Sequence, residues 1–118
     1  MTWDAARSFC WTSAHHGGEL ASVPDQATND FLTTLTSDRA WIGGTDEGSE
    51  GDWRWSDGTP WSYDSWKVNE PNNAGGGQHY SVINYKGVGN WDDERGWNKM
   101  PFFCQSTPGV VLLIIYQG

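Results

Sequence analysis

Oxygen-bearing side chains are the groups in this sequence with the greatest capacity for chemistry. Fifteen Asp and Glu stand against seven Lys and Arg, which gives a net charge of −8 and an isoelectric point near 4.5. Such an excess of carboxylates has two interpretations, a soluble and self-repelling surface or a binding site for a hard cation. Composition alone leaves both open.

The composition argues against several classes of protein. Seven basic residues are too few to build a cationic surface for phosphate backbones, so we do not expect nucleic acid as a partner. The three histidines form no Ser-His-Asp arrangement, so we do not expect an enzyme; His15 and His16 are adjacent, point in different directions and are expected to be exposed. The apolar run at residues 110–116 is far shorter than the ~20 residues of a membrane span, so it reads as a buried strand.

Two cysteines, Cys10 and Cys104, lie near opposite ends of the chain and match no zinc or redox spacing. A disulfide between them would close a loop of about 100 residues and contribute up to ~4.7 kcal/mol, whereas two free buried thiols are the alternative. The disulfide would indicate an oxidising compartment, and hence a secreted or extracellular protein.

Two helices are expected in the first third of the chain. The first covers residues 2–16, where apolar residues recur at helical spacing, Thr2 can cap the start, and two glycines follow. The second begins at Asp25. The apolar face predicted for it consists of Phe31, Leu32 and Leu35.

Short strands are expected at residues 20–23, 40–42, 80–85 and 100–105, and in the tail at about 109–116. The strand at 40–42 should stop at Gly43, because turn-forming residues dominate from about 44 to 79. The tryptophans of this long loop region argue against disorder, since their rings could bury into a small core: Trp53, Trp55, Trp61 and Trp66. The prediction is one α+β domain over residues 1–118.

Six segments resemble the C-type lectin-like domain in order and spacing, over roughly residues 2–105. They are Trp3–Cys10 (WDAARSFC), Glu19–Val23 (ELASV), Ala40–Gly44 (AWIGG), Trp66–Asn72 (WKVNEPN), Trp91–Asp93 (WDD) and Phe102–Cys104 (FFC). The resemblance implies two helices with two small antiparallel sheets and a long calcium-binding loop region. It also implies a disulfide between Cys10 and Cys104.

The sequence departs from this family at two structural positions. The family's second disulfide is absent, since Tyr80 and Gly96 stand where its cysteines would be. The strand that normally precedes the first helix is also missing. We expect the tail at 109–116 to fold back antiparallel and fill the vacant edge.

The resemblance implies one calcium ion in the loop region, with a cis peptide before Pro71. Gln78 stands where a glutamate is usual and Asp92 where an asparagine is usual, so the number of carboxylate ligands is unchanged. The expected calcium ligands are Glu70, Asn72, Gln78, Asp92 and Asp93. Read without the resemblance, Glu70-Pro71-Asn72 would be a surface turn.

In this family a sugar ligates the calcium through two neighbouring hydroxyls. Glu70 and Asn72 can serve one hydroxyl, and Gln78 and Asp92 the other with donor and acceptor exchanged. The resemblance therefore implies glycans of the mannose, glucose or fucose type. Trp97 and Tyr85 could flank the sugar or be buried, whereas Trp91 is expected in the core.

A second calcium ion is common in the family. Asp46, Glu50 and Asn73 are its candidate ligands here, although Asn73, Gln78 and His79 replace expected carboxylates. A solvated acidic loop is the alternative.

The main competing function is the same fold used to bind a protein or ice surface, because a fold does not fix a function. Retention of the Glu-Pro-Asn and Trp-x-Asp motifs favours sugar. A single shallow site would need a homo-oligomer or another multivalent context for avidity, and no heptad or collagen-like repeat encodes one. A role in innate immunity, adhesion or clearance is not distinguished by the sequence.

Overall fold

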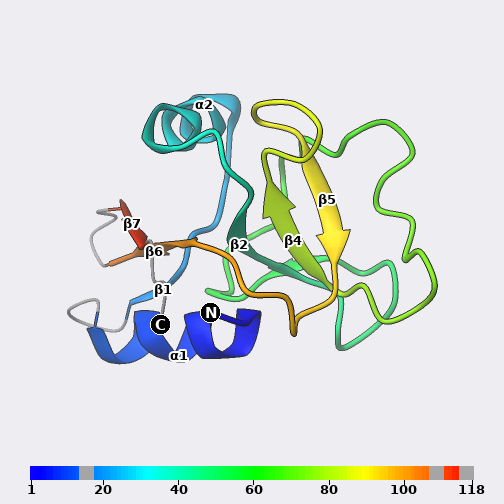
Figure 1. Cartoon of the computed structure of the whole chain (residues 1–118), viewed down its shortest axis with the longest axis horizontal. Helices are drawn as coiled ribbons and strands as arrows, with labels where there is room; N and C mark the ends of the chain where they lie inside the picture. The colour runs from blue at the N-terminus through cyan, green and yellow to red at the C-terminus, as the bar shows by residue number, and fades with distance from the viewer. Residues whose placement is uncertain (14–17, 107–110, 115–118) are drawn as a thin grey trace.

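The computed structural model describes residues 1–13, 18–106 and 111–114 (Figure 1). Within these ranges the chain forms, in order, α1 (Trp3–Ser13), β1 (Glu19–Leu20), α2 (Gln26–Leu35), β2 (Ala40–Thr45), β3 (Arg54–Trp55), β4 (Tyr80–Ile83), β5 (Trp91–Glu94), β6 (Phe102–Gln105) and β7 (Val111–Ile114). The predicted α+β class is confirmed. Neither described helix is long and apolar enough to cross a membrane.

Both helices begin at the predicted caps. The Thr2 hydroxyl accepts a hydrogen bond from the Ala5 amide at 3.3 Å, and the Asp25 carboxylate accepts one from the Thr28 amide at 2.8 Å. These side chains satisfy amide groups that have no partner inside the first turn. The predicted end of the first helix, at residues 14–17, lies outside the described residues.

The predicted apolar face of α2 is only partly correct. Leu32 is buried, but Phe31 and Leu35 are 49% and 39% exposed. Asn29 is buried in their place, because its side-chain amide donates to the Gly89 carbonyl at 3.1 Å and accepts from the Trp91 indole at 2.8 Å. A polar residue thus lies on the inner face of this helix, and only its tertiary partners make that possible.

The described strands form one connected mixed sheet in place of the two separate antiparallel sheets that were expected. Its order is β1-β6-β2-β4-β5, with β3 paired to β2 and β7 paired to β6. The pairing of β2 with β6 is parallel, at Trp41 and Phe102, and the other pairings are antiparallel. Strand β2 joins the two halves because it pairs on both of its edges: Trp41 lies opposite Val82 of β4 on one edge and opposite Phe102 of β6 on the other.

Strand β2 continues through Gly43, where it was predicted to stop. A Cβ at Gly43 would lie 3.0 and 3.1 Å from the carbonyl oxygens of Leu20 and Ala21, and one at Gly44 would lie 3.0 Å from the Trp61 ring. The two glycines therefore allow close packing inside a strand, which the sequence pattern cannot distinguish from a turn.

The sheet separates two apolar clusters, and residues adjacent in a strand point to opposite sides. The cluster on the α1 side contains Trp3, Ala6, Cys10, Leu20, Trp41, Val82, Phe102 and Cys104. The cluster on the α2 side contains Ala21, Val23, Leu32, Ala40, Ile42, Trp55, Ile83, Trp91 and Phe103. Figure 1 shows the two helices on opposite sides of the sheet.

The Cys10–Cys104 disulfide joins α1 to β6 across 94 positions of sequence, which confirms the pairing that the resemblance implied. Its two sulfurs lie inside the α1-side cluster. At the positions of the family's second disulfide, which this sequence lacks, the Tyr80 ring covers Gly96: a Cβ at Gly96 would lie 2.7 Å from that ring.

Strand β7 pairs antiparallel along the whole of β6, from Phe102 opposite Ile114 to Gln105 opposite Val111. The antiparallel return of the tail is thus confirmed for its described part. Val111 and Leu113 pack against the α2-side cluster, and Ile114 packs against the α1-side cluster. The tail therefore contributes apolar side chains to both faces of the sheet.

Deleting residues 108–118 is expected to destabilise the domain by about 3 kcal/mol, because it exposes β6 and removes three partly buried aliphatic side chains. Thermal unfolding followed by circular dichroism measures the effect. A melting temperature equal to that of the intact chain would contradict this role for β7.

Candidate functional site

Trp91, the first residue of β5, anchors the long loop between β3 and β4. Its fully buried ring lies 5.5 to 5.9 Å from four aromatic rings, one contributed by β3 and three by the loop that follows it. These rings belong to Trp55, Trp61, Tyr63 and Trp66. The predicted tryptophan core exists, and the prediction that Trp91 is a core residue is confirmed.

The backbone of Trp91 fixes the loop in register with β5. Its amide donates to the Ser65 carbonyl at 2.9 Å, and its carbonyl accepts from the Lys67 amide at 2.9 Å. Directly after this pairing the chain turns, because the Glu70 amide donates to the Lys67 carbonyl at 2.8 Å. Glu70 is thereby brought beside Asp92, the residue after Trp91.

Three predicted ligands, Glu70, Asp92 and Asp93, meet in one cluster. One carboxylate oxygen from each lies within 4.8 Å of the other two. In the β4–β5 pairing Asp92 lies opposite Val82 and Asp93 opposite Ser81, so a regular strand supplies two of the three groups. The peptide bond between Glu70 and Pro71 is cis, as the resemblance implied.

The electrostatics of this cluster favour a cation. The buried Oε1 atom of Glu70 receives no hydrogen bond from the described part of the protein. Burial, together with the neighbouring carboxylates of Glu70 and Asp93, raises the pKa of Asp92 to about 8. Burying carboxylates so close together is costly unless a positive charge lies between them, and a divalent cation supplies that charge.

The two amide side chains expected as ligands, those of Asn72 and Gln78, are held by one backbone donor. The Ala74 amide donates both to the Asn72 side-chain oxygen at 3.1 Å and to the Gln78 side-chain oxygen at 2.8 Å, so the two oxygens share one donor. Each has a second lone pair for a cation. The Asp93 carboxylate accepts from the backbone amides of Asn72 at 3.2 Å and Asn73 at 2.6 Å, which ties the Glu-Pro-Asn segment to β5.

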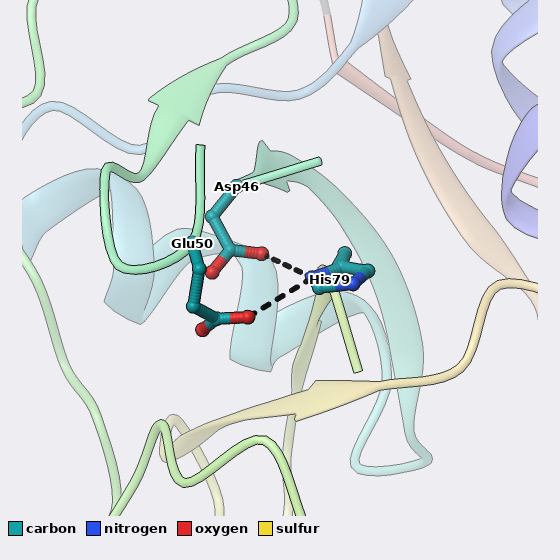
Figure 2. Close-up of side chains that lie close together, drawn as sticks. All are labelled: Asp46, Glu50 and His79. Carbon is teal, nitrogen blue, oxygen red and sulfur yellow. Dashed lines mark hydrogen bonds and ion pairs between the residues drawn. The ribbon is translucent and has the colours of Figure 1, made fainter. Parts of the chain in front are cut away.

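The candidates for a second calcium site form a separate cluster with a histidine in it (Figure 2). The Nδ1 atom of His79 lies 2.9 Å from Asp46 Oδ1 and 3.5 Å from Glu50 Oε1. Asn73 meets this group through its amide nitrogen, which donates to Glu50 Oε1 at 2.8 Å. The sequence identified these residues individually but gave no signal that the imidazole lies between the two carboxylates.

The two aromatic residues proposed to flank a sugar differ in position. Trp97 is 71% exposed, and it helps to line a surface hollow of about 440 Å³ together with Gly77 and His79, the neighbours of Gln78 in sequence. Tyr85 follows the far end of β4 and packs under the Arg39 guanidinium, whose carbon lies 4.9 Å from the ring centre. Trp97 is thus the better placed of the two. His15 and His16 lie outside the described residues.

One residue of the site region was not anticipated. The Arg95 guanidinium donates to the carbonyls of Ala74 at 3.1 Å and Gly76 at 2.9 Å, and so closes the glycine-rich turn before Gln78. Three consecutive glycines, residues 75–77, adopt positive φ angles there. Three glycines in a row predict a turn from the sequence alone. The side chain that holds the turn belongs to Arg95, which follows β5, and no residue near the turn in sequence indicated its role.

Comparison with known proteins gives consistent results. The family model for the lectin C-type domain matches residues 1–106. A lectin of Pleurodeles waltl is 34% identical over 90% of this chain and 64% of its own length. The galactose-specific lectin nattectin of Thalassophryne nattereri is 34% identical over 88% of this chain and 67% of its own. The chain therefore spans about two thirds of the length of these relatives.

Two solved structures illustrate the range of similar folds. The cow C-type carbohydrate-recognition domain of CD23, solved in the presence of a GlcNAc2Man3 oligosaccharide, superimposes with a TM-score of 0.73 at 33% identity, over 81% of this chain and 71% of that one. A calcium-independent type II antifreeze protein superimposes with a TM-score of 0.73 at 25% identity, over 97% and 75% of the two chains.

Replacing Asp92 by Asn is expected to stabilise the protein when no divalent cation is present. Because the folded-state pKa is raised, the folded protein holds this proton more tightly than the unfolded chain. Stability is therefore full below the unfolded value of 3.8 and falls as the pH rises towards about 8. Asparagine removes that loss, which we expect to be about 1–2 kcal/mol at pH 7 after allowance for solvent screening.

Thermal unfolding in chelator at pH 5 and pH 7 measures this effect, and the gain should be larger at pH 7. The exposed Asp64→Asn variant loses the same charge outside the cluster and serves as the matched control. A melting temperature of Asp92→Asn below that of the wild type at pH 7 would contradict the mutual repulsion of the three carboxylates.

Proposed function

The chain belongs to the C-type lectin domain family, and we propose that it binds carbohydrates through one calcium ion held in its loop region. The relatives are lectins, which are carbohydrate-binding proteins and not enzymes. The observation that carries the proposal is the cluster of Glu70, Asp92 and Asp93, in which the buried Oε1 of Glu70 has no hydrogen-bond partner among the described residues.

Calcium is the cation that suits these residues best. All five proposed ligands offer oxygen, from three carboxylates and from the side-chain amides of Asn72 and Gln78. Calcium accepts about six to eight oxygens and tolerates irregular geometry, so positions remain for ligand hydroxyls or water. Magnesium would require a stricter octahedron.

A sugar diol could complete the coordination. One hydroxyl would donate to Glu70 and accept from the Asn72 amide. The other would donate to Asp92 and accept from the Gln78 amide, whose donor and acceptor atoms allow both directions. We propose glycans of the mannose, glucose or fucose type, as the Glu-Pro-Asn motif implies. The galactose specificity in the name of nattectin makes galactose the alternative to include in any test.

Two further parts of the proposal concern context. A disulfide is stable in an oxidising compartment, so the protein is proposed to act outside the cell. One shallow site holds a monosaccharide weakly, so we propose that several sites act together, in a homo-oligomer or on a multivalent glycan surface.

Glycan-array binding measured with calcium and with EDTA is the central experiment. We expect binding to mannose-, glucose- or fucose-type glycans that EDTA abolishes. In the Glu70→Gln variant we expect binding at least about 30-fold weaker, because the charged partner of one hydroxyl is lost together with a calcium ligand.

The matched control is Glu47→Gln, an exposed glutamate that accepts a hydrogen bond from the Tyr80 hydroxyl and lies outside the ligand set. It should bind like the wild type. Calcium-dependent galactose binding would change the proposed specificity only. An absence of glycan binding in both buffers would favour the alternative function, binding to a protein or ice surface. The similar calcium-independent antifreeze protein is the reason to keep ice among these alternatives.

Calcium affinity is expected to increase with pH up to about 8, since the ion must displace the proton that Asp92 holds in the calcium-free protein. One proton released per calcium corresponds to a change of up to about tenfold in Kd per pH unit below that value. Calorimetric titration at pH 6, 7, 8 and 9, in two buffers of different ionisation enthalpy, measures both affinity and proton release. An affinity that is constant between pH 6 and 8 would contradict the prediction.

A further inference from the structure

We propose that Asp46, Glu50 and His79 form a binding site for a divalent transition metal, zinc above all, and not for a second calcium ion. The three side chains come from the residue after β2, the loop that follows it and the residue before β4. Figure 2 shows both carboxylates directed at the same imidazole nitrogen. The inference does not depend on sugar binding, because it concerns other residues.

The distances within the cluster match a tetrahedral ion. Zinc binds histidine nitrogen and carboxylate oxygen at about 2.0–2.1 Å, which places neighbouring ligand atoms of a tetrahedron about 3.3 Å apart. The two contacts of His79 Nδ1, 2.9 Å to Asp46 Oδ1 and 3.5 Å to Glu50 Oε1, lie on either side of that value. Small side-chain rotations would suffice to admit the ion.

The same cluster is poorly suited to calcium. Calcium takes oxygen ligands, and here a nitrogen atom occupies the centre of the group. Asn73 does not supply an oxygen either, because its Oδ1 accepts from the Gln78 amide at 2.9 Å while its Nδ2 faces Glu50. The Gln78 backbone donor fixes this orientation of the Asn73 amide. Two carboxylates remain as side-chain oxygen donors, so water or backbone carbonyls would have to supply most of the oxygens that calcium prefers.

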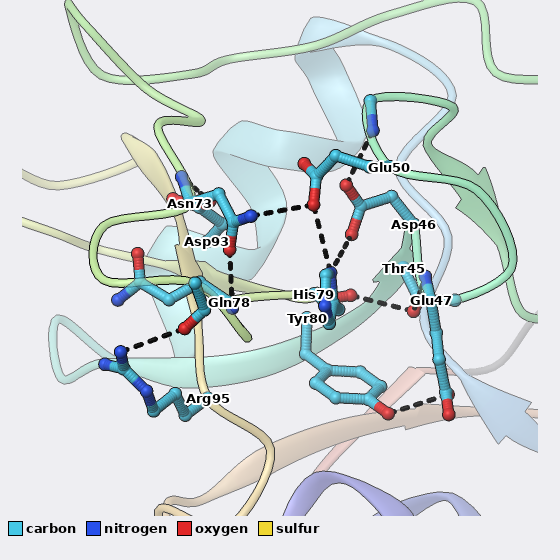
Figure 3. Close-up of polar contacts among 12 residues, drawn as sticks. Thr45, Asp46, Glu47, Glu50, Asn73, Gln78, His79, Tyr80, Asp93 and Arg95 are labelled. Atoms are coloured by element: carbon cyan, nitrogen blue, oxygen red, sulfur yellow. Dashed lines mark hydrogen bonds and ion pairs between the residues drawn. The ribbon is translucent and has the colours of Figure 1, made fainter.

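Surrounding hydrogen bonds hold the ligands in place (Figure 3). The Asp46 side chain is fully buried, and its Oδ2 accepts from the Gly51 amide at 2.8 Å, which leaves Oδ1 for a metal. The His79 carbonyl accepts from the Asp46 amide at 3.1 Å and from the Thr45 hydroxyl at 2.8 Å. Partners of this kind fix ligand orientation in metal sites.

The site is also open to an entering ion. The side chains of His79 and Glu50 are 30% and 56% exposed, in contrast to the buried Asp46. Solvent can therefore reach the cluster and provide a fourth ligand. A divalent ion would neutralise the two carboxylates. The competing account is a simple imidazole–carboxylate contact that binds no metal.

Calorimetric titration of the metal-free, full-length protein with zinc chloride tests the proposal. We expect one zinc ion per chain and binding at least about tenfold weaker in His79→Gln, since even residues that only support a ligand cost that much. The double variant His15→Gln/His16→Gln removes the other two histidines and should retain zinc. Asp92→Asn should also retain it, because it changes only the calcium cluster of Glu70, Asp92 and Asp93.

Nuclear magnetic resonance of the imidazole nitrogens in the wild-type protein gives a second readout that does not depend on a variant folding. Zinc should shift the Nδ1 resonance of His79, and calcium should not. The proposal would be overturned if zinc left this resonance unchanged, if binding survived in His79→Gln, or if it were lost in the double histidine variant or in Asp92→Asn.

Discussion

The position of Trp91 is the constraint on which the rest of the binding region depends. Its indole is held by the buried Asn29 side chain and by contacts with aromatic rings of the loop, while its backbone pairs with Ser65 and Lys67. One residue thus links α2, the sheet and the long loop. Because Asp92 and Asp93 follow it directly, the same anchor determines where two of the three carboxylates lie.

That anchor also explains how the domain tolerates a destabilising site. Three carboxylates close together, one oxygen of which has no hydrogen bond in the described structure, cost free energy in the absence of a cation. Burial of the tryptophan rings and the Cys10–Cys104 cross-link offset that cost. Stability resides in the core and the disulfide, whereas the carboxylate cluster, where we propose that calcium binds, lowers it.

The two acidic clusters are neighbours connected by Asn73. Its backbone amide donates to Asp93, its side-chain nitrogen to Glu50, and its side-chain oxygen accepts from the Gln78 amide. Each cluster has a different donor set, oxygen alone around Asp92 and a nitrogen with two carboxylates around His79. Metal preference follows donor type, so the two clusters, although both carry negative charge, suit different ions: calcium at Asp92 and zinc at His79, as we propose.

The sequence by itself determined what depends on neighbouring residues: the helix caps at Thr2 and Asp25, the turn character of the loop, and the motifs whose order revealed the family and the cysteine pair. Tertiary structure decided what depends on distant partners. It buried Asn29 where Phe31 was expected, carried β2 through Gly43, joined the strands into one sheet, and set His79 between Asp46 and Glu50. The physical reason is range: caps and turns are satisfied within a few residues, whereas packing and ligand convergence depend on side chains far apart in the chain.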